Sequence, residues 1–310
     1  MPLPATSPES TVLRTLFDRP RLLLILTTLF WAGNIVIGRA IAGTVPPVTL
    51  ACLRWTLASL FFLPFAWTSL RIDADRIAKH RGILLFLGLI GPACYNSLFY
   101  FGLVSTPALN GLVLNAAGPM VIALVARGFF GDRLSAFQIA GMIAGFAGVL
   151  LIVAKGDPRV LGALRFASGD LILLAAILAW SVYTAFLRKR PRMSWQSYNF
   201  ITYAIAAIAN VPIAAGELAL GGSITPSWAA AAAIVYVAIF PSLLAYIFYN
   251  RAVELLGPAA AGLYMFLIPA FGAVLAVGLL GEELHWFHAA GFTLIIGGVL
   301  IGSRRGLTAK

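Results

Sequence analysis

Residues 82–130 decide how this chain folds. They read GILLFLGLIGPACYNSLFYFGLV (82–104), a short break STPALNG (105–111), and then LVLNAAGPMVIALVARGFF (112–130). Each half has roughly the twenty residues that a helix needs to cross a hydrocarbon core about 30 Å thick, and no charge precedes Arg127. The stretch therefore predicts two consecutive membrane-spanning helices.

Each of these two helices carries a proline in mid-span, Pro92 in the first and Pro119 in the second. Proline has no backbone N–H, so the carbonyls of Gly88 and Asn115 lose their usual helical partner. Lipid cannot satisfy a free carbonyl, so protein or a watery cavity must do so. We expect the wall of an internal cavity beside the first proline, lined by Tyr95, Asn96, Ser97, Phe99 and Tyr100.

The same pattern returns about 150 residues later in the chain. The segment GDRLSAFQIAGMIAGFAGVLL (131–151) aligns without gaps on GEELHWFHAAGFTLIIGGVLI (281–301). Single matches between apolar segments mean little, but ordered matches over half a chain indicate an internal duplication. Further matches follow in the same order: Trp31/Trp180, Arg39/Arg188, Pro92/Pro241, Pro107/Pro258 and Pro119/Pro269.

The composition excludes an ordinary soluble domain. Of the 310 residues, 61% are hydrophobic and only 11% are charged, too few to cover a soluble surface. A net charge of +11 would suggest nucleic acid as the partner of a soluble protein. Here the basic residues stand at the ends of apolar runs, which indicates membrane topology. Cys52 and Cys94 lie inside apolar runs and are interpreted as small buried side chains, with no disulfide.

The hydropathy pattern predicts ten spans, and hence an all-α membrane protein of two five-helix repeats. The first repeat covers 22–154 and the second 169–303, with an N-terminal segment 1–21, a linker 155–168 and a C-terminal tail 304–310. We interpret the first run as a spanning helix, because cleavage after residue 42 would remove Trp31, the counterpart of Trp180. The spans are roughly 22–41, 46–69, 82–103, 107–128, 134–154, 169–188, 195–216, 227–251, 257–280 and 285–303.

The distribution of Lys and Arg predicts the topology. Seventeen of them fall on one side of the spans and four on the other, with Arg54 inside the second span. The positive-inside rule then places both termini in the cytoplasm. An odd number of helices per repeat inverts the second repeat relative to the first. Inverted repeats are typical of secondary transporters that bind substrate near the midplane, between the repeats.

Polar and aromatic residues within the spans form the candidate substrate site. They are Trp31, Asn34, Tyr95, Asn96, Phe99, Trp180, Tyr183, Tyr246, Tyr249, Asn250 and Arg54. Ser242, Tyr246 and Tyr249 form one stripe on the eighth helix. Other interpretations stay open: the tryptophans as interfacial anchors, the asparagines as bonds between helices, and the tyrosine stripe as ordinary packing.

Arg54 has three interpretations. Its side chain could reach the outer interface, stack on Trp55, or offer a carboxylate-binding group, since a charge in the membrane is costly unless it is used. Glycines 141, 145 and 148, and 291, 297 and 298, predict close packing of helices five and ten. We expect Pro92, Pro119, Pro241 and Pro269 to act as hinges.

Signatures of an enzyme are missing from the sequence. There is no HExxH motif, no Cys/His cluster and no pair of carboxylates within a span. We therefore expect no catalytic residues, no metal and no cofactor, and an integral membrane enzyme is the competing class. Every Asp and Glu lies at or beyond a predicted helix end, with Asp170, Glu217 and Glu254 nearest to the spans. This predicts transport down a substrate gradient without proton coupling.

The sequence resembles the drug/metabolite transporter superfamily, in particular its EamA-type exporters. LTTLFWAGNIVIGRAI (26–41), LACLRW (50–55), the segment from Pro107 to Pro119 and the two repeat ends carry the resemblance over nearly the whole chain. The aromatic centre is similar to that of YddG-type amino-acid exporters. The resemblance implies a bacterial inner-membrane exporter of amino acids or similar metabolites, working by alternating access.

In this interpretation Asn34, Asn96 and tyrosine hydroxyls hold the charged groups of the substrate. Trp31, Tyr95, Phe99, Trp180 and Tyr246 then cover its apolar part. The alternative is export of lipophilic drugs without a preference for amino acids. The working expectation is a monomer whose partners are the lipid bilayer and a small-molecule substrate, with no nucleic acid.

Overall fold

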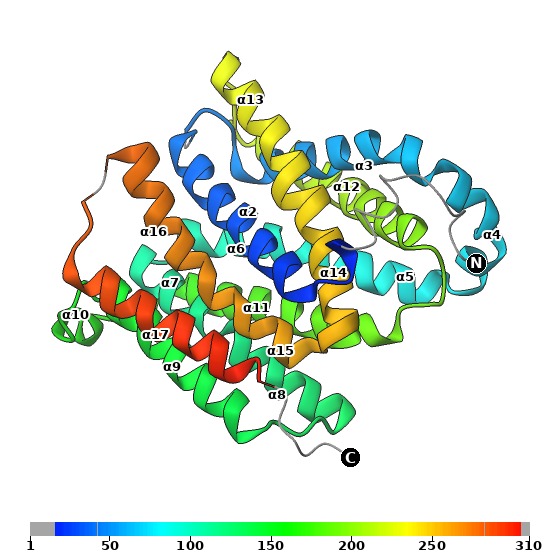
Figure 1. Ribbon diagram of the computed structural model, residues 1–310. Helices are drawn as coiled ribbons and strands as arrows, with labels where there is room; N and C mark the ends of the chain where they lie inside the picture. The colour runs from blue at the N-terminus through cyan, green and yellow to red at the C-terminus, as the bar shows by residue number, and fades with distance from the viewer. Residues whose placement is uncertain (1–15, 42, 282, 305–310) are drawn as a thin grey trace.

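The computed structural model describes residues 16–41, 43–281 and 283–304, and every regular element there is a helix (Figure 1). In the first repeat the long elements are α2 (Pro20–Ala40), α3 (Pro47–Ile72), α5–η1–α6 (Arg81–Gly88, Leu89–Ala93, Cys94–Val104), α7–α8 (Ala108–Ala116, Gly118–Phe130) and α9 (Ala136–Val153). In the second repeat they are α11 (Ser168–Phe186), α12 (Trp195–Ala219), α13–η3–α14 (Trp228–Val237, Ala238–Leu244, Ala245–Leu256), α15–η4–α16 (Pro258–Leu263, Tyr264–Phe266, Leu267–Leu280) and α17 (Trp286–Gly302).

These elements confirm the predicted fold class. Within the described residues, nine helical segments are long and apolar enough to cross a membrane, and α17 is a shorter apolar helix in the place of the tenth predicted span. The shorter elements α4 (Ala74–Lys79), α10 (Arg159–Gly162) and η2 (Leu187–Lys189) lie between the spans. Most of the predicted segment 1–21 and of the tail 304–310 lies outside the described residues.

Equivalent helices of the two repeats make equivalent contacts. α3 packs on α12, and α9 packs on α17, which are equivalent helices of the two repeats. The first helix of repeat one, α2, packs on α14 and α16 of repeat two, while its counterpart α11 packs on α6 and α8 of repeat one. This exchange is what a two-fold axis between inverted repeats produces.

The prolines of the third and eighth spans lie in π-helical turns. Pro92 lies in η1 and Pro241 in η3, so the ladder of α-helical hydrogen bonds is interrupted at equivalent places in both repeats. In η3 the carbonyl of Val237, four residues before Pro241, accepts a hydrogen bond from the Ser242 hydroxyl at 2.7 Å. Protein therefore satisfies the carbonyl that the proline leaves free, as the argument on prolines in lipid requires.

The expectation that Pro119 kinks a continuous helix is wrong. The fourth span consists of two helices that meet at Ala117, and Pro119 lies in the first turn of α8. A proline at that position loses nothing, because the first N–H groups of a helix have no partner within it. Pro269 likewise stands near the start of α16, after the 3₁₀ turn η4. The role of the four prolines as hinges stays a prediction.

Glycines let α9 and α17 approach each other closely, as predicted, but Gly297 is not one of them, because a Cβ there would meet nothing within 4 Å. A Cβ atom at Gly298 would lie 2.7 Å from the carbonyl oxygen of Gly141, and a Cβ at Gly148 would lie 2.7 Å from that of Gly291. Real Cβ atoms do not come so near to backbone oxygens. Backbone contact between two helices in lipid depends on small residues at such positions.

We expect Gly298→Ala to destabilise the protein by about 1–3 kcal/mol, because the added methyl group must push α17 away from α9. The neighbouring Gly297 provides the control, since a Cβ there would meet nothing within 4 Å. Thermal unfolding in detergent should show a lower Tm for Gly298→Ala and an unchanged Tm for Gly297→Ala. Equal Tm values for the two variants would contradict the proposed packing.

Candidate functional site

The predicted aromatic residues meet at the interface between the two repeats. The ring of Trp31 on α2 lies 5.3 Å from Trp180 on α11, and 5.3 Å from Tyr249 on α14, between ring centroids. Tyr246 lies 5.6 Å from Trp180. We call this group the aromatic cluster; its members are Trp31, Trp55, Tyr95, Phe99, Trp180, Tyr183, Tyr203, Tyr246 and Tyr249.

Sequence reasoning missed two members of this cluster. Trp55 on α3 meets Tyr246 edge-on at 4.9 Å and lies 5.4 Å from Tyr203 on α12. From the sequence, Trp55 is expected only as a surface on which Arg54 could stack. Tyr203 lies four residues after Asn199 on α12, a helical spacing that would have placed both side chains on one face.

The aromatic cluster is packed. Trp180 and Tyr246 are each 2% exposed, and their rings fill the space in which the sequence predicted an open cavity. Trp31, Tyr95 and Phe99 keep partial exposure. Phe99 lies at the border of the cluster, where it stacks on Tyr95 at 5.7 Å. A substrate ring can enter only if these side chains separate.

Arg54 is buried beside the aromatic cluster, with 1% of its surface exposed. Its Nε donates to the Ser242 hydroxyl at 2.7 Å, one Nη lies 3.5 Å from the Asn96 Oδ1, and the guanidinium lies 5.3 Å from the centre of the Trp55 ring. The stacking predicted from sequence is thus present, and a side chain reaching the outer interface is not. No carboxylate within the described residues lies within 4 Å of this cation.

A buried chain of polar side chains borders the cluster on its other flank. The Tyr183 hydroxyl donates to Asn250 Oδ1 at 2.8 Å, and Asn250 Nδ2 donates to Asn199 Oδ1 at 2.9 Å. The hydroxyls of Thr184 and Tyr249 lie 3.1 Å apart. These contacts join α11, α12 and α14, all from the second repeat. Asn199 is a further residue that the sequence analysis did not single out.

The remaining predicted site residues are less tightly held. The Tyr95 hydroxyl lies 3.4 Å from Asn115 Oδ1, and Asn96 Nδ2 lies 3.4 Å from the carbonyl of Pro92. Asn34 is half-buried on α2 and has no side-chain hydrogen bond recorded to the part of the chain that the structure describes. Asn34 therefore adds no hydrogen bond to the cluster within the described residues, and its part in the site stays a prediction.

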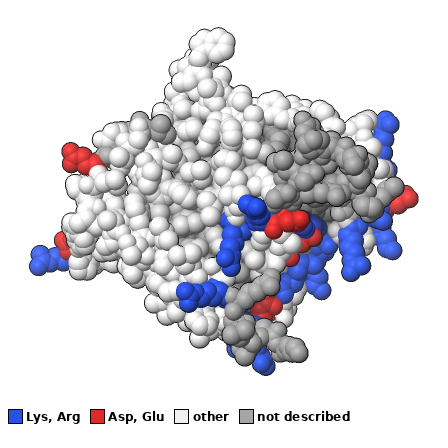
Figure 2. Space-filling view, in the orientation of Figure 1, with Lys and Arg blue, Asp and Glu red and all other residues white. Residues whose placement is uncertain are grey.

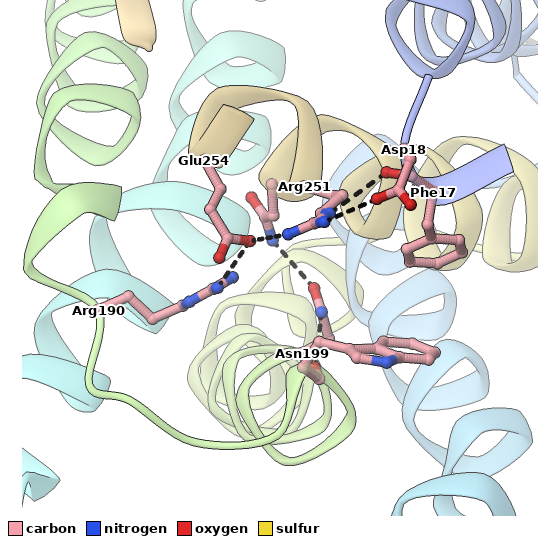
Figure 3. A network of polar contacts seen from close by, with 8 residues as sticks. Phe17, Asp18, Arg190, Asn199, Arg251 and Glu254 are labelled. Carbon is pink, nitrogen blue, oxygen red and sulfur yellow. Dashed lines mark hydrogen bonds and ion pairs between the residues drawn. The ribbon is translucent and has the colours of Figure 1, made fainter. Parts of the chain in front are cut away.

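Basic residues gather at one end of the helical bundle (Figure 2). We call it the arginine-rich end and define it by Arg188, Arg190 and Arg251. Arg188 pairs with Asp132 at 2.9 Å across the two repeats, and Arg190 pairs with Glu254 at 3.0 Å. Figure 3 shows Arg251 between Glu254, at 3.2 Å, and Asp18, also at 3.2 Å.

Two carboxyl groups at the arginine-rich end have lowered pKa values. The hydrogen bonds from Arg188 hold the pKa of Asp132 below its usual value. Burial alone would raise the pKa of Asp73, but hydrogen bonds from Ser194, Ser197 and Arg76 outweigh it and lower that pKa. Both groups are therefore ionised at neutral pH and hold the ends of the helices together.

A vestibule of about 1470 Å³ opens at the arginine-rich end. Arg188, Arg190 and Arg192 line its outer part, and it reaches inward as far as Thr184 and Asn250. These two residues hydrogen-bond to Tyr249 and Tyr183 of the aromatic cluster. The vestibule thus leads from one end of the bundle to the cluster.

The acidic residues nearest to the spans have structural partners. Glu217 on α12 accepts from the backbone N–H groups of Val48 and Thr49, at 3.1 and 2.6 Å, and so caps α3. Asp170, in the first turn of α11, accepts from Asn110 Nδ2 at 2.8 Å and from the Ala167 N–H at 2.9 Å. A carboxylate at a helix N-terminus is stabilised by the free N–H groups there.

Comparison with known proteins defines the class of this chain. In the part of the chain that the structure describes, nine long apolar helices and the shorter α17 form two inverted repeats with an aromatic and polar centre between them, the architecture expected of a membrane-spanning transporter. The EamA-like transporter family matches residues 20–154 and again residues 167–304, and the chain belongs to that family.

Similar proteins are named as transporters. Their matches to this chain cover nearly the whole length of both proteins. The uncharacterized transporter YyaM of Bacillus subtilis is 25% identical over 286 residues, which cover 91% of this chain and 92% of that protein. A probable terminal-alkyne amino-acid exporter of Streptantibioticus cattleyicolor is 28% identical and covers 92% of this chain and 93% of its own. One crystal structure, 21% identical with a TM-score of 0.74, covers 92% of this chain and 96% of its own and shares the fold.

Proposed function

We propose that this transporter exports amino acids and similar amphiphilic metabolites, including aromatic and apolar ones, by alternating access. The observation that carries the proposal is the aromatic cluster at the repeat interface, with the buried Arg54 on one flank and amide and hydroxyl groups on the other. Secondary transporters of inverted repeats bind substrate at such an interface. The name of the similar Streptantibioticus cattleyicolor protein supports amino acids as the substrate class.

The rings and the polar groups would bind different parts of the substrate. Trp31, Tyr95, Phe99, Trp180 and Tyr246 cover the apolar part of the substrate when the cluster opens. Asn34, Asn96, Asn250 and the hydroxyls of Tyr183 and Tyr249 hold its polar groups, and Arg54 holds the carboxylate. Aromatic rings suit this task, because one face of an amphiphile is apolar and the other needs hydrogen bonds.

The proposed topology places the arginine-rich end and both termini in the cytoplasm of a bacterial cell, with the protein in the inner membrane. The vestibule is then the cytoplasmic entrance. The repeats extend over 22–154 and 169–303, and we take the working unit to be a monomer. The protein moves its substrate without chemical conversion, so catalysis has no part in the proposal.

Counterflow in proteoliposomes tests this function directly. Vesicles loaded with unlabelled phenylalanine should accumulate labelled phenylalanine above the level of protein-free vesicles. A hydrophobic cation such as tetraphenylphosphonium serves as the competitor. Exchange of the cation without exchange of any amino acid would favour export of lipophilic drugs and would contradict our proposal.

We expect transport to proceed down a substrate gradient alone, without an imposed pH gradient. The acids nearest to the spans, Glu217, Asp170 and Glu254, hold helix ends or an arginine side chain, which supports transport without a proton carried on a carboxyl group. The initial rate of efflux should be equal with and without a proton gradient across the vesicle. A rate that depends on the gradient and collapses in Asp170→Asn would contradict this prediction.

A further inference from the structure

Within the described residues, no carboxylate pairs with the charge of Arg54. The guanidinium is always protonated, and it carries five N–H donors. Its recorded partners are a serine hydroxyl, an asparagine oxygen and the face of Trp55, all of them neutral. The carboxylates at the arginine-rich end are paired with other arginines, and Glu217 and Asp170 hold helix ends. A buried cation without an anion is costly, so a bound anion is favoured there.

The unpaired polar atoms of the aromatic cluster are also donors. The indole N–H groups of Trp55 and Trp180 are buried and make no hydrogen bond in the described structure. Both indoles contact Tyr246, at 4.9 and 5.6 Å between ring centroids. Arg54 stacks on Trp55, so its N–H groups add to the donors on this side of the cluster. A ligand that satisfies them must bring acceptors, and a carboxylate brings acceptors only.

The charge of the whole ligand then decides between substrates of similar shape. A zwitterionic amino acid places its carboxylate at Arg54 but leaves the site with one net positive charge, and its ammonium group finds no carboxylate in the cluster. An aromatic acid without the amino group neutralises Arg54 and brings no second cation. In surroundings of low dielectric constant this difference favours the anion.

We propose that aromatic monocarboxylates without an amino group bind this site more tightly than the corresponding amino acids, with Arg54 as the carboxylate receptor. This inference rests on the proposed function, since it concerns the same site, and it adds aryl carboxylic acids to the exported compounds. The specificity then comes from the carboxylate and the ring, and the ammonium group of an amino acid is tolerated but not recognised.

Three ligands of nearly equal shape test the proposal. They are L-phenylalanine, 3-phenylpropanoate, which lacks the ammonium group, and 2-phenylethylamine, which lacks the carboxylate. Ligand-dependent thermal stabilisation of the purified protein gives their apparent Kd values. We expect 3-phenylpropanoate to bind at least tenfold more tightly than phenylalanine, and 2-phenylethylamine not to bind. If 2-phenylethylamine bound as tightly as 3-phenylpropanoate, or more tightly, the proposal would be overturned.

Variants of Arg54 test the receptor. Arg54→Gln should weaken binding of 3-phenylpropanoate at least tenfold, and Arg54→Lys should weaken it less. Arg127→Gln, which removes an exposed arginine on α8, is the charge-matched control and should bind like the wild type. Unchanged binding in Arg54→Gln would sink the assignment. If that variant does not fold, Ser242→Ala, which removes the partner of the Arg54 Nε, takes its place. The comparison of the three ligands on the wild type still tests whether the site prefers the carboxylate.

Competition in the counterflow assay separates this inference from the proposed function. Inhibition is measured rather than uptake, because protonated aryl acids cross lipid on their own. If phenylalanine exchanges and 3-phenylpropanoate neither binds nor competes, only the inference fails. If 3-phenylpropanoate binds and no amino acid exchanges, the inference stands and the amino-acid assignment fails.

Discussion

Replacement of Trp180 by alanine is expected to lower the rate of transport at least tenfold. The ring of Trp180 contacts Trp31, Tyr95, Tyr183, Tyr246 and Tyr249, so it joins the two repeats at the centre of the aromatic cluster. In the proposed site, its removal takes away one of the tryptophan rings that cover the apolar part of the substrate. Initial rates of phenylalanine counterflow, normalised to the amount of reconstituted protein, provide the measurement.

The size of the cavity that this substitution leaves requires two controls. Truncation of a buried tryptophan costs about 3–5 kcal/mol, which could unfold the protein. Trp180→Phe keeps an aromatic ring and should retain a folded protein with an intermediate rate. Trp228→Ala, at the start of α13 where the side chain is 91% exposed, removes the same surface far from the cluster and should leave transport unchanged. Normal rates in Trp180→Ala would remove this residue from the site.

Replacement of Pro241 by alanine is expected to slow exchange at least fivefold and to leave ligand affinity nearly unchanged. Alanine restores a backbone N–H that can bond to the carbonyl of Val237, which now accepts from Ser242. Regular α-helical hydrogen bonding can then replace the π-helical turn η3, and the helix stiffens where it is expected to bend. Counterflow rates and the apparent Kd for 3-phenylpropanoate or phenylalanine, measured on the same preparation, separate the two effects.

Pro212→Ala is the matched control for this prediction. Pro212 also stands inside a helix, but it is exposed on α12, which stays a continuous α-helix around it. We expect normal exchange in that variant. Among the predicted hinges, Pro241 has a larger expected effect than Pro119, because Pro119 lies in the first turn of α8 and interrupts no hydrogen bond. If Pro241→Ala exchanged as fast as the wild type, η3 would be a packing feature only.

The elements that could be predicted from the sequence are those that depend on local composition. Apolar runs long enough for the bilayer give the spans, because lipid forces every backbone group into a helix. The ordered prolines and tryptophans give the duplication, and an odd number of spans per repeat gives its inversion. The contact between Trp31 and Trp180 follows from the same reasoning, since equivalent residues near the axis of a two-fold repeat lie close together.

The sequence could not say which side of each helix faces the protein. Lipid is as apolar as a protein interior, so hydrophobicity does not distinguish the two. Leu124 and Ile122 on α8 illustrate this: they are similar side chains two residues apart, yet one is 63% exposed and the other is completely buried. For this reason the sequence alone does not assign Trp55, Asn199 and Tyr203 to the site.

What the sequence by itself determined is a ten-span protein of two inverted repeats, with aromatic residues and prolines in equivalent mid-span positions. Only the tertiary structure decided that Trp180, Tyr183, Tyr246 and Tyr249 pack into a cluster of buried rings. It also showed that Arg54 does not reach the outer interface but stacks on Trp55, and that its partners Ser242 and Asn96 come from elements far away in the chain. Charge and hydropathy are properties of one residue, whereas the partner that a buried charge meets is set by how whole helices pack.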